Sequence, residues 1–202
     1  MKKVVIITAH PDLDTLCEKN ADTLEESAKE QGFAVKRFRS LDFPWIETNP
    51  IKHGFSSKFD EPTKELQEAD VVVITSPMWN YGSPAAFKNF IDGVVQHRKL
   101  FKFVAGKTEK KLSRVSFLSR IVPQGHPVGL MKAKKLLCVW TADGPSWYYK
   151  VFQKKNVLFL QIKAIFSFCG IKKFDQFILG MTRLRTEEEM KKWFNKLKNY
   201  KF

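Results

Sequence analysis

The chain has 202 residues, a hydrophobic fraction of 44% and an aromatic fraction of 13%. This length and composition exclude a disordered chain and predict one domain, residues 1–202, with a sizeable core. The formal net charge of +14 is typical of a solvated surface or of attraction to an anionic ligand such as a dinucleotide. Nucleic-acid binding has no support beyond charge, because zinc-finger spacing, RNA-stacking motifs and helix-turn-helix patterns are missing from the sequence.

The three cysteines, Cys17, Cys138 and Cys169, show no regular spacing. An odd number of cysteines in apolar or helical stretches predicts reduced thiols and a cytoplasmic protein. The N-terminus is basic and then apolar, like a signal peptide. Its apolar run is short and ends at His10 and Pro11, which favours a first core strand. No apolar run reaches the length that spans a bilayer.

Apolar runs alternate with helical patterns along the chain. In chain order, the sequence predicts a strand at 4–9, a helix at 15–31, a strand at 34–38, a helix at 62–69, a strand at 70–76, a helix at 83–96, a strand at 135–141, a helix at 157–169, a strand at 174–179 and a helix at 186–200. Pro84 is expected near the first turn of its helix, where proline is tolerated. Thr186 and Glu189 have the spacing of a capping box.

Strands that are apolar throughout, each followed by a helix, predict an α/β protein with a parallel sheet covered on both faces. Five such units suit the doubly wound fold with strand order 2-1-3-4-5, in which ligands bind outside the carboxyl ends of the strands. This rule selects three loops, at residues 10–17, 77–83 and 142–149. The basic connection at 99–128 is unusually long and is predicted to be an insertion or a lid.

The first loop, AHPDLD, has two interpretations. It is similar to the HPDD signature of zinc-dependent N-acetylglucosaminyl deacetylases, and His and Asp are both zinc ligands. Here Leu13 replaces the second aspartate of that signature, Asp14 comes one position later, and the other histidines are scattered singly. The ligand set for zinc is therefore incomplete, and no metal is expected.

The alternative is an anion site at the start of the first helix, where unpaired N–H groups and the helix dipole favour a phosphate. His10 and the Thr15 hydroxyl can donate hydrogen bonds to it, and Leu16 and Cys17 follow at the start of the helix. A plainer function for Asp14 or Thr15 is to cap the helix and bind nothing.

The second loop lies in SPMWNYGSPAAFKNFIDGV, residues 76–94, and is more elaborate than a simple strand-to-helix turn. Trp79 and Tyr81 stand with Asn80 and Gly82 at the ligand end of a buried strand. These aromatic side chains either pack on a neighbouring subunit or form a wall beside a flat heterocycle.

Four segments resemble the flavodoxin-like NAD(P)H:quinone oxidoreductase and FMN-dependent azoreductase family, in the same order and over nearly the whole chain. They are AHPDLDTLCEKNADTLEESAKEQGFAVKRFRSLDF at 9–43, SPMWNYGSPAAFKNFID at 76–92, PVGLMKAKKLLCVWTADG at 127–144 and FCGIKKFDQFILG at 168–180. The resemblance implies a flavodoxin-like fold, FMN or alternatively FAD as cofactor, and NADPH or NADH as electron donor.

The resemblance also implies the cofactor-binding residues by position. Contacts to the flavin phosphate are implied for His10, Thr15 and Cys17, with Leu16 between them. A wall along the flavin ring is implied for Pro77, Met78, Trp79, Asn80 and Tyr81. An approach to the N1/O2 edge of the ring is implied for Thr141, Ala142, Asp143 and Gly144. The family commonly has Ser or Asn at the position of Cys17 and a small residue at that of Asp143.

For activity, the resemblance implies ping-pong transfer of two electrons to a quinone, azo or nitroaromatic acceptor, with the flavin carrying the chemistry. Tyr149 aligns with a family tyrosine near the flavin, without the histidine that follows it in some quinone reductases. A homodimer is implied, with residues 157–168 as the candidate interface, and the basic insertion favours NADPH. A flavin-binding regulatory subunit, for instance of an ion channel, and the zinc deacetylase are the alternatives.

Overall fold

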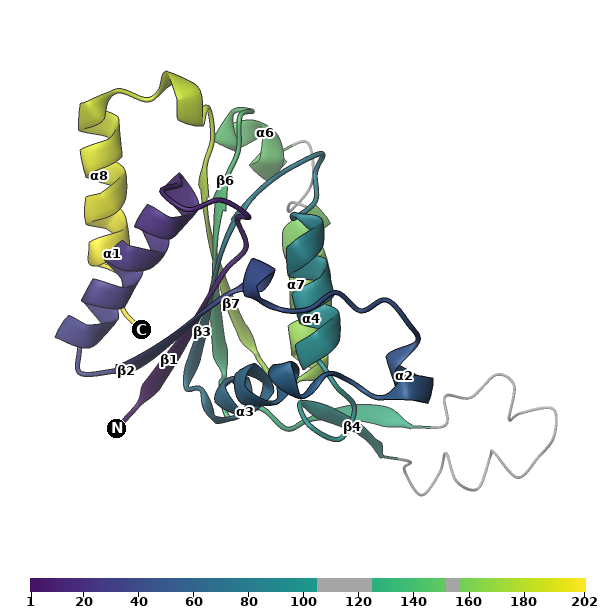
Figure 1. The fold of residues 1–202 in the computed structure, drawn as a ribbon. Coiled ribbons are helices and arrows are strands. Elements are labelled where there is room, and N and C mark those ends of the chain that lie inside the picture. Colours follow the sequence, from purple (N-terminus) through teal and green to yellow (C-terminus); the bar gives the residue numbers. More distant parts are fainter. Residues whose placement is uncertain (105–124, 152–156) are drawn as a thin grey trace.

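The computed structural model describes residues 1–104, 125–151 and 157–202. Its centre is a five-stranded sheet in the order β2-β1-β3-β6-β7 (Figure 1). The strands, all parallel, are β1 (Lys3–Thr8), β2 (Ala34–Arg39), β3 (Val71–Pro77), β6 (Lys135–Thr141) and β7 (Lys173–Leu179). The five predicted strands and their predicted order are thus confirmed.

Helices cover both faces of this sheet, as buried parallel strands require. On one face lie α1 (Leu16–Glu30) and α8 (Glu187–Lys198), and on the other α3 (Asp60–Glu68), α4 (Ala85–Val94) and α7 (Val157–Phe168) (Figure 1). Residues of β1 alternate between the two layers: Val4 and Ile6 belong to the core under α1 and α8, and Val5 and Ile7 to the other core.

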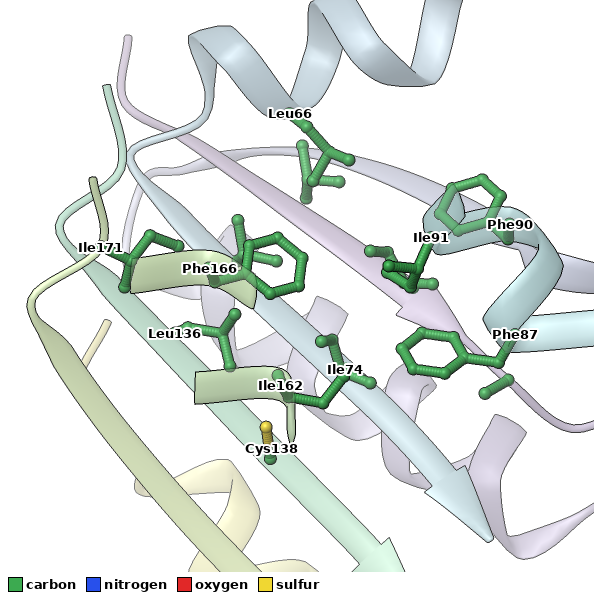
Figure 2. Packing of buried hydrophobic residues seen from close by; sticks show 14 of the residues in the cluster. Leu66, Ile74, Phe87, Phe90, Ile91, Leu136, Cys138, Ile162, Phe166 and Ile171 are labelled. Atoms are coloured by element: carbon green, nitrogen blue, oxygen red, sulfur yellow. The ribbon is translucent and has the colours of Figure 1, made fainter. Parts of the chain in front are cut away.

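The larger core lies beneath α4 and α7 (Figure 2). Ile74 of β3 and Leu136 of β6 lie on the same side of the sheet as Phe87 and Phe90 of α4 and Phe166 of α7, and all five side chains are buried. Burying a side chain of this size contributes about 1.5–3 kcal/mol relative to leaving it exposed. This core holds β3 and β6 side by side, so the loops at their carboxyl ends have a rigid base.

The sequence did not predict a second sheet, an antiparallel pair formed by β4 (Phe101–Val104) and β5 (His126–Gly129). The two strands are short, and they pair residues that are far apart in the sequence, so no local sequence pattern predicts this pairing. They form the base of the insertion predicted at 99–128, at the end of the main sheet where β1 begins (Figure 1). The body of the predicted lid, residues 105–124, lies outside the described residues.

Helix boundaries differ from the sequence predictions in detail. The helix predicted at 83–96 is shorter, because Pro84 is the N-cap of α4, with φ −52° and ψ 145°, directly before the first turn as expected. Two short helices, α2 (Pro50–His53) and α6 (Ser146–Val151), are too brief to show helical periodicity and were not predicted. Across the described ranges, no helix has the length and apolar character to cross a membrane.

Candidate functional site

A cavity of about 370 Å³ opens at the carboxyl ends of the parallel strands. Its volume lies within the range of about 300–1,000 Å³ that is usual for small-molecule sites. It is lined by His10, Thr15, Leu16, Cys17, Pro77, Met78, Trp79, Thr141, Ala142, Asp143, Thr182 and Arg183. The three loops selected from the sequence therefore meet around one space. The segment after β7 joins them and was not predicted to do so.

The start of α1 forms one side of the cavity. Thr15 is the N-cap, and its hydroxyl accepts a hydrogen bond from the backbone N–H of Glu18 at 3.4 Å. The same hydroxyl still carries a proton to donate. The next two N–H groups, of Leu16 and Cys17, have no acceptor within the described residues. Free donors of this kind at a helix N-terminus, together with the helix dipole, favour an anion.

Of the two residues expected to cap the helix, Thr15 does so and Asp14 does not. The φ of Asp14, 55°, is left-handed, and this residue directly precedes the N-cap of α1. Because the Thr15 hydroxyl accepts its hydrogen bond from the helix, it keeps its own proton to donate toward the cavity that it lines.

His10 presents a defined donor. Its Nδ1 accepts a hydrogen bond from the backbone N–H of Asp12 at 3.0 Å, so the neutral ring carries its proton on Nε2. The ring lies edge-on to Trp79, with centroids 5.6 Å apart at 79°. Within the described ranges, no three His, Cys, Asp or Glu residues are grouped to hold a metal ion. The ring contact with Trp79 links the first two loops, and the neutral ring offers its Nε2–H as a donor.

Cys17 is buried at the base of the cavity, with its Sγ 3.5 Å from the Thr141 Oγ1. Burial raises the pKa of the Cys17 thiol to about 12, and the hydrogen bond with Thr141 only partly opposes this. The side chain is therefore a neutral thiol at physiological pH. It joins α1 to β6 without bringing negative charge to the anion site.

The second loop contains a tight turn. Trp79 and Gly82 exchange two backbone hydrogen bonds of 2.8 Å, while Asn80 and Tyr81 have φ of 47° and 63°. Two positive φ angles in a two-residue loop define a type I′ turn, which strand twist favours. Trp79 lines the cavity together with Pro77 and Met78, whereas Asn80 and Tyr81 lie at the exposed tip, outside the lining.

The tip of this turn is tied to α6. The hydroxyls of Tyr81 and Tyr148 hydrogen-bond, and this contact is the main cause of a raised pKa of Tyr148. Two adjacent left-handed residues that are not glycine cost conformational energy, which is typical of segments shaped for binding. The loop is thus held in a fixed position beside the cavity.

Gly144 and Tyr149 both belong to the third loop and were expected near the ligand, but neither lines the cavity. A Cβ at Gly144 would stand 2.6 Å from the Tyr149 hydroxyl, so only glycine permits this approach. The side chain of Tyr149 is buried. Its hydroxyl lies against Gly144, so it packs within the third loop.

The segment after β7 is locked against the third loop. Met181 N–H donates to the Gly144 carbonyl at 3.0 Å, and Thr182 N–H donates to the Ala142 carbonyl at 3.3 Å. A Cβ at Gly180 would come within 2.3 Å of the Gly144 carbonyl oxygen. These contacts bring Thr182 and Arg183 to the cavity. The rule that ligands bind at carboxyl ends of strands could have found them, since they follow the last strand.

The lining fits a phosphorylated flat heterocycle such as FMN. Donors that suit a phosphate come from His10, Thr15 and the N–H groups of α1. An apolar and aromatic wall suited to a ring comes from Pro77, Met78 and Trp79. The donors and the wall share one cavity, so the residues present match both parts of such a ligand.

Comparisons with known proteins agree with this architecture. A family model described as flavodoxin-like fold matches residues 2–200. An FMN-dependent NADH:quinone oxidoreductase of Mycoplasma pneumoniae is 28% identical, covering 95% of this chain and 91% of the relative. An uncharacterized NAD(P)H oxidoreductase of Haemophilus influenzae is 24% identical, covering 93% and 88%.

Solved structures share the fold at lower identity. An FMN-dependent NADH-azoreductase from Bacillus anthracis in complex with FMN superposes with a TM-score of 0.70 at 19% identity, covering 98% of this chain and 96% of that one. An NAD(P)H:quinone oxidoreductase from Methanothermobacter marburgensis gives 0.72 at 13% identity, covering 97% and 92%. With the family match over nearly the whole sequence and the observed strand order, the chain belongs to the flavodoxin-like fold family.

Proposed function

We propose that this protein is an FMN-dependent NAD(P)H oxidoreductase that passes two electrons to a quinone, azo or nitroaromatic acceptor. The observation that carries the proposal is the cavity itself, in which phosphate donors and an aromatic wall face one space. The quinone oxidoreductase of M. pneumoniae and the azoreductase of B. anthracis, both named as FMN-dependent, support the choice of cofactor and reaction.

The first loop would bind the phosphate. Leu16 and Cys17 supply backbone N–H groups, Thr15 a hydroxyl and His10 the Nε2–H. Hydrogen bonds to a charged acceptor are worth more than neutral ones, at about 1.5–3 kcal/mol each. The second and third loops would hold the ring between the Pro77–Trp79 wall and the Thr141–Asp143 segment.

The flavin supplies hydride and two-electron chemistry when bound, and the protein positions it and excludes water. No ionisable side chain of the described lining is required as an acid or base, and Tyr149 is not in contact with the cavity. A donor and an acceptor would use the same space in turn, so we expect ping-pong kinetics with NADPH or NADH as the first substrate.

We further propose a homodimer in the cytoplasm. On α7, Leu160, Ala164 and Phe168 form an exposed stripe at intervals of four residues, which is one face of a helix. The three cysteines are free and buried, in keeping with a reducing compartment.

The purified protein tests the proposal. We expect its visible absorption to show bound flavin, or to show it after reconstitution with FMN. Anaerobic NADH or NADPH should bleach this absorption, and a benzoquinone should restore it. Initial-rate plots at several quinone concentrations should give parallel lines.

A protein that binds neither FMN nor FAD would overturn the proposal. Bound flavin that NAD(P)H does not reduce would refute the enzymatic activity and indicate a binding subunit instead. Converging rate lines would contradict only the ping-pong order.

A further inference from the structure

The cavity mouth carries an ion pair that the proposed function does not use. Arg183 lies 3.2 Å from the Asp143 carboxylate, and both residues line the cavity. Within the described part of the chain, these two are the only Asp, Glu, Lys or Arg residues of the lining. This pair therefore supplies the formally charged side chains that a ligand meets on the described lining, beside the partial positive charge at the start of α1.

The two partners are held unequally. The Asp143 carboxylate also accepts a hydrogen bond from the Thr182 hydroxyl at 3.2 Å, and its side chain is 65% exposed. The Arg183 side chain is 84% exposed and bonds to Asp143 alone among the described residues. The backbone beneath both is fixed by the Met181–Gly144 and Thr182–Ala142 hydrogen bonds. The carboxylate is thus anchored, whereas the guanidinium can turn about a fixed backbone.

A phosphate ester competes well for such a guanidinium. It carries more negative charge than a carboxylate and offers several oxygens for bidentate hydrogen bonds. An Asp143 without its partner would instead repel the phosphate that the start of α1 is arranged to receive. Arg183 therefore neutralises the Asp143 carboxylate, and the pairing keeps a cation available at the cavity mouth.

We propose that Arg183 is a phosphate-recognising residue, held by Asp143 in the free protein and transferred to the phosphate of the ligand on binding. The inference rests on the proposed function, because it takes FMN as the ligand. It makes Arg183 a determinant of the preference for phosphorylated over unphosphorylated flavin. Asp143 competes with the phosphate for Arg183 and therefore reduces this preference.

Equilibrium titrations with FMN and with riboflavin, followed by quenching of flavin fluorescence, test this. R183Q should weaken FMN binding about tenfold and change riboflavin binding less than about twofold. D143N should act in the opposite direction and tighten FMN binding about threefold, because it frees Arg183 and removes a repelling charge. The ratio of the two affinities separates phosphate recognition from general damage to the cavity.

A second exposed ion pair provides matched controls. Lys192 and Glu188 lie 2.6 Å apart on α8, away from the cavity lining, with side chains 73% and 77% exposed. K192Q and E188Q reproduce the two changes in net charge and should leave the FMN to riboflavin ratio at the wild-type value. Added KCl should reduce this ratio in the wild type more than in R183Q, because exposed charges are screened.

Equal effects of R183Q on FMN and riboflavin, or weaker FMN binding by D143N, would overturn the inference while leaving the proposed function standing. A matching change in K192Q would show that net charge alone is responsible and would also overturn it. Failure of the wild-type protein to bind any flavin would refute the proposed function instead.

Discussion

Cys17 shows how a single side chain is adapted to its place. It lies at the start of α1, lines the cavity and contacts Thr141. The family that the sequence resembles commonly has Ser or Asn at the position of Cys17. Its pKa, raised to about 12 by burial, keeps the thiol neutral. A thiol is a weak hydrogen-bond donor, so this position contributes less to anion binding than a hydroxyl would.

We therefore predict that C17S tightens FMN binding by about three- to tenfold, the equivalent of one improved hydrogen bond. The change adds no charge, because thiol and hydroxyl are both neutral at pH 7. Fluorescence titration measures the affinity. C17A should bind FMN more weakly than C17S, and equal affinities of the two variants would contradict the prediction.

C138S is the matched control. Cys138 is fully buried in the core beneath α7 and does not line the cavity (Figure 2). Its replacement should lower stability and leave the affinity of the folded protein for FMN unchanged.

At the scale of an element, α8 is fixed by its first turn. Thr186 accepts a hydrogen bond from Glu189 N–H, and the Glu189 carboxylate accepts one from Thr186 N–H, which confirms the predicted capping box. The helix follows directly on the segment that carries Thr182 and Arg183. Stability of its start therefore bears on the cavity mouth.

We predict that T186A lowers the free energy of unfolding by about 1 kcal/mol, the usual cost of losing an N-cap hydroxyl. Urea denaturation at pH 7 measures it. T23A is the control, because the Thr23 hydroxyl only bonds back to the Lys19 carbonyl inside α1. A loss as large in T23A as in T186A would argue against a capping effect.

The same box predicts a pH dependence. The hydrogen bond from Thr186 N–H, followed by that from Arg185, lowers the pKa of Glu189 below its usual 4.5. A folded-state pKa below the unfolded value adds stability that is complete above the unfolded pKa and is lost as the pH falls through the folded pKa. E189Q should therefore be less stable than the parent at pH 7, and thermal denaturation should show this gap closing below about pH 4. A gap that stays constant down to pH 3 would contradict the assignment.

At the scale of the whole molecule, the structure exposes an apolar groove. This groove of about 360 Å³ lies between α4, α7 and β4. It is lined by Ile91, Asp92, Val95, Phe101, Phe103, Ala164, Ile165 and Phe168. Exposed apolar surface of this kind, continuous with the stripe on α7, is typical of protein contacts. It supports the proposed homodimer.

We predict that L160E shifts the protein from dimer to monomer at micromolar concentration, measured by size-exclusion chromatography with light scattering. A charge in an apolar interface would lose its hydration without gaining a partner. L41E is the matched control, because Leu41 is also 43% exposed but lies in a 3₁₀ turn after β2. A parent protein that is monomeric at every concentration would refute the dimer.

The sequence by itself determined the parallel sheet, its strand order and the position of the ligand loops. Continuous apolar strands, helical periodicity and capping residues are local signals, and the carboxyl-end rule then selected the loops that carry His10, Thr15, Cys17, Trp79 and Ala142. Their presence in one cavity is the part of the site that could be predicted.

Only the tertiary structure decided the rest. Asn80 and Tyr81 lie at the tip of a type I′ turn and outside the cavity lining, although they stand beside Trp79 in sequence. Asp143 meets Thr182, 39 residues further along the chain, because Gly180 lets the two loops approach. No local sequence pattern predicts this contact between the two loops. It depends on the packing of β6 against β7 and on the space left because Gly180 has no side chain.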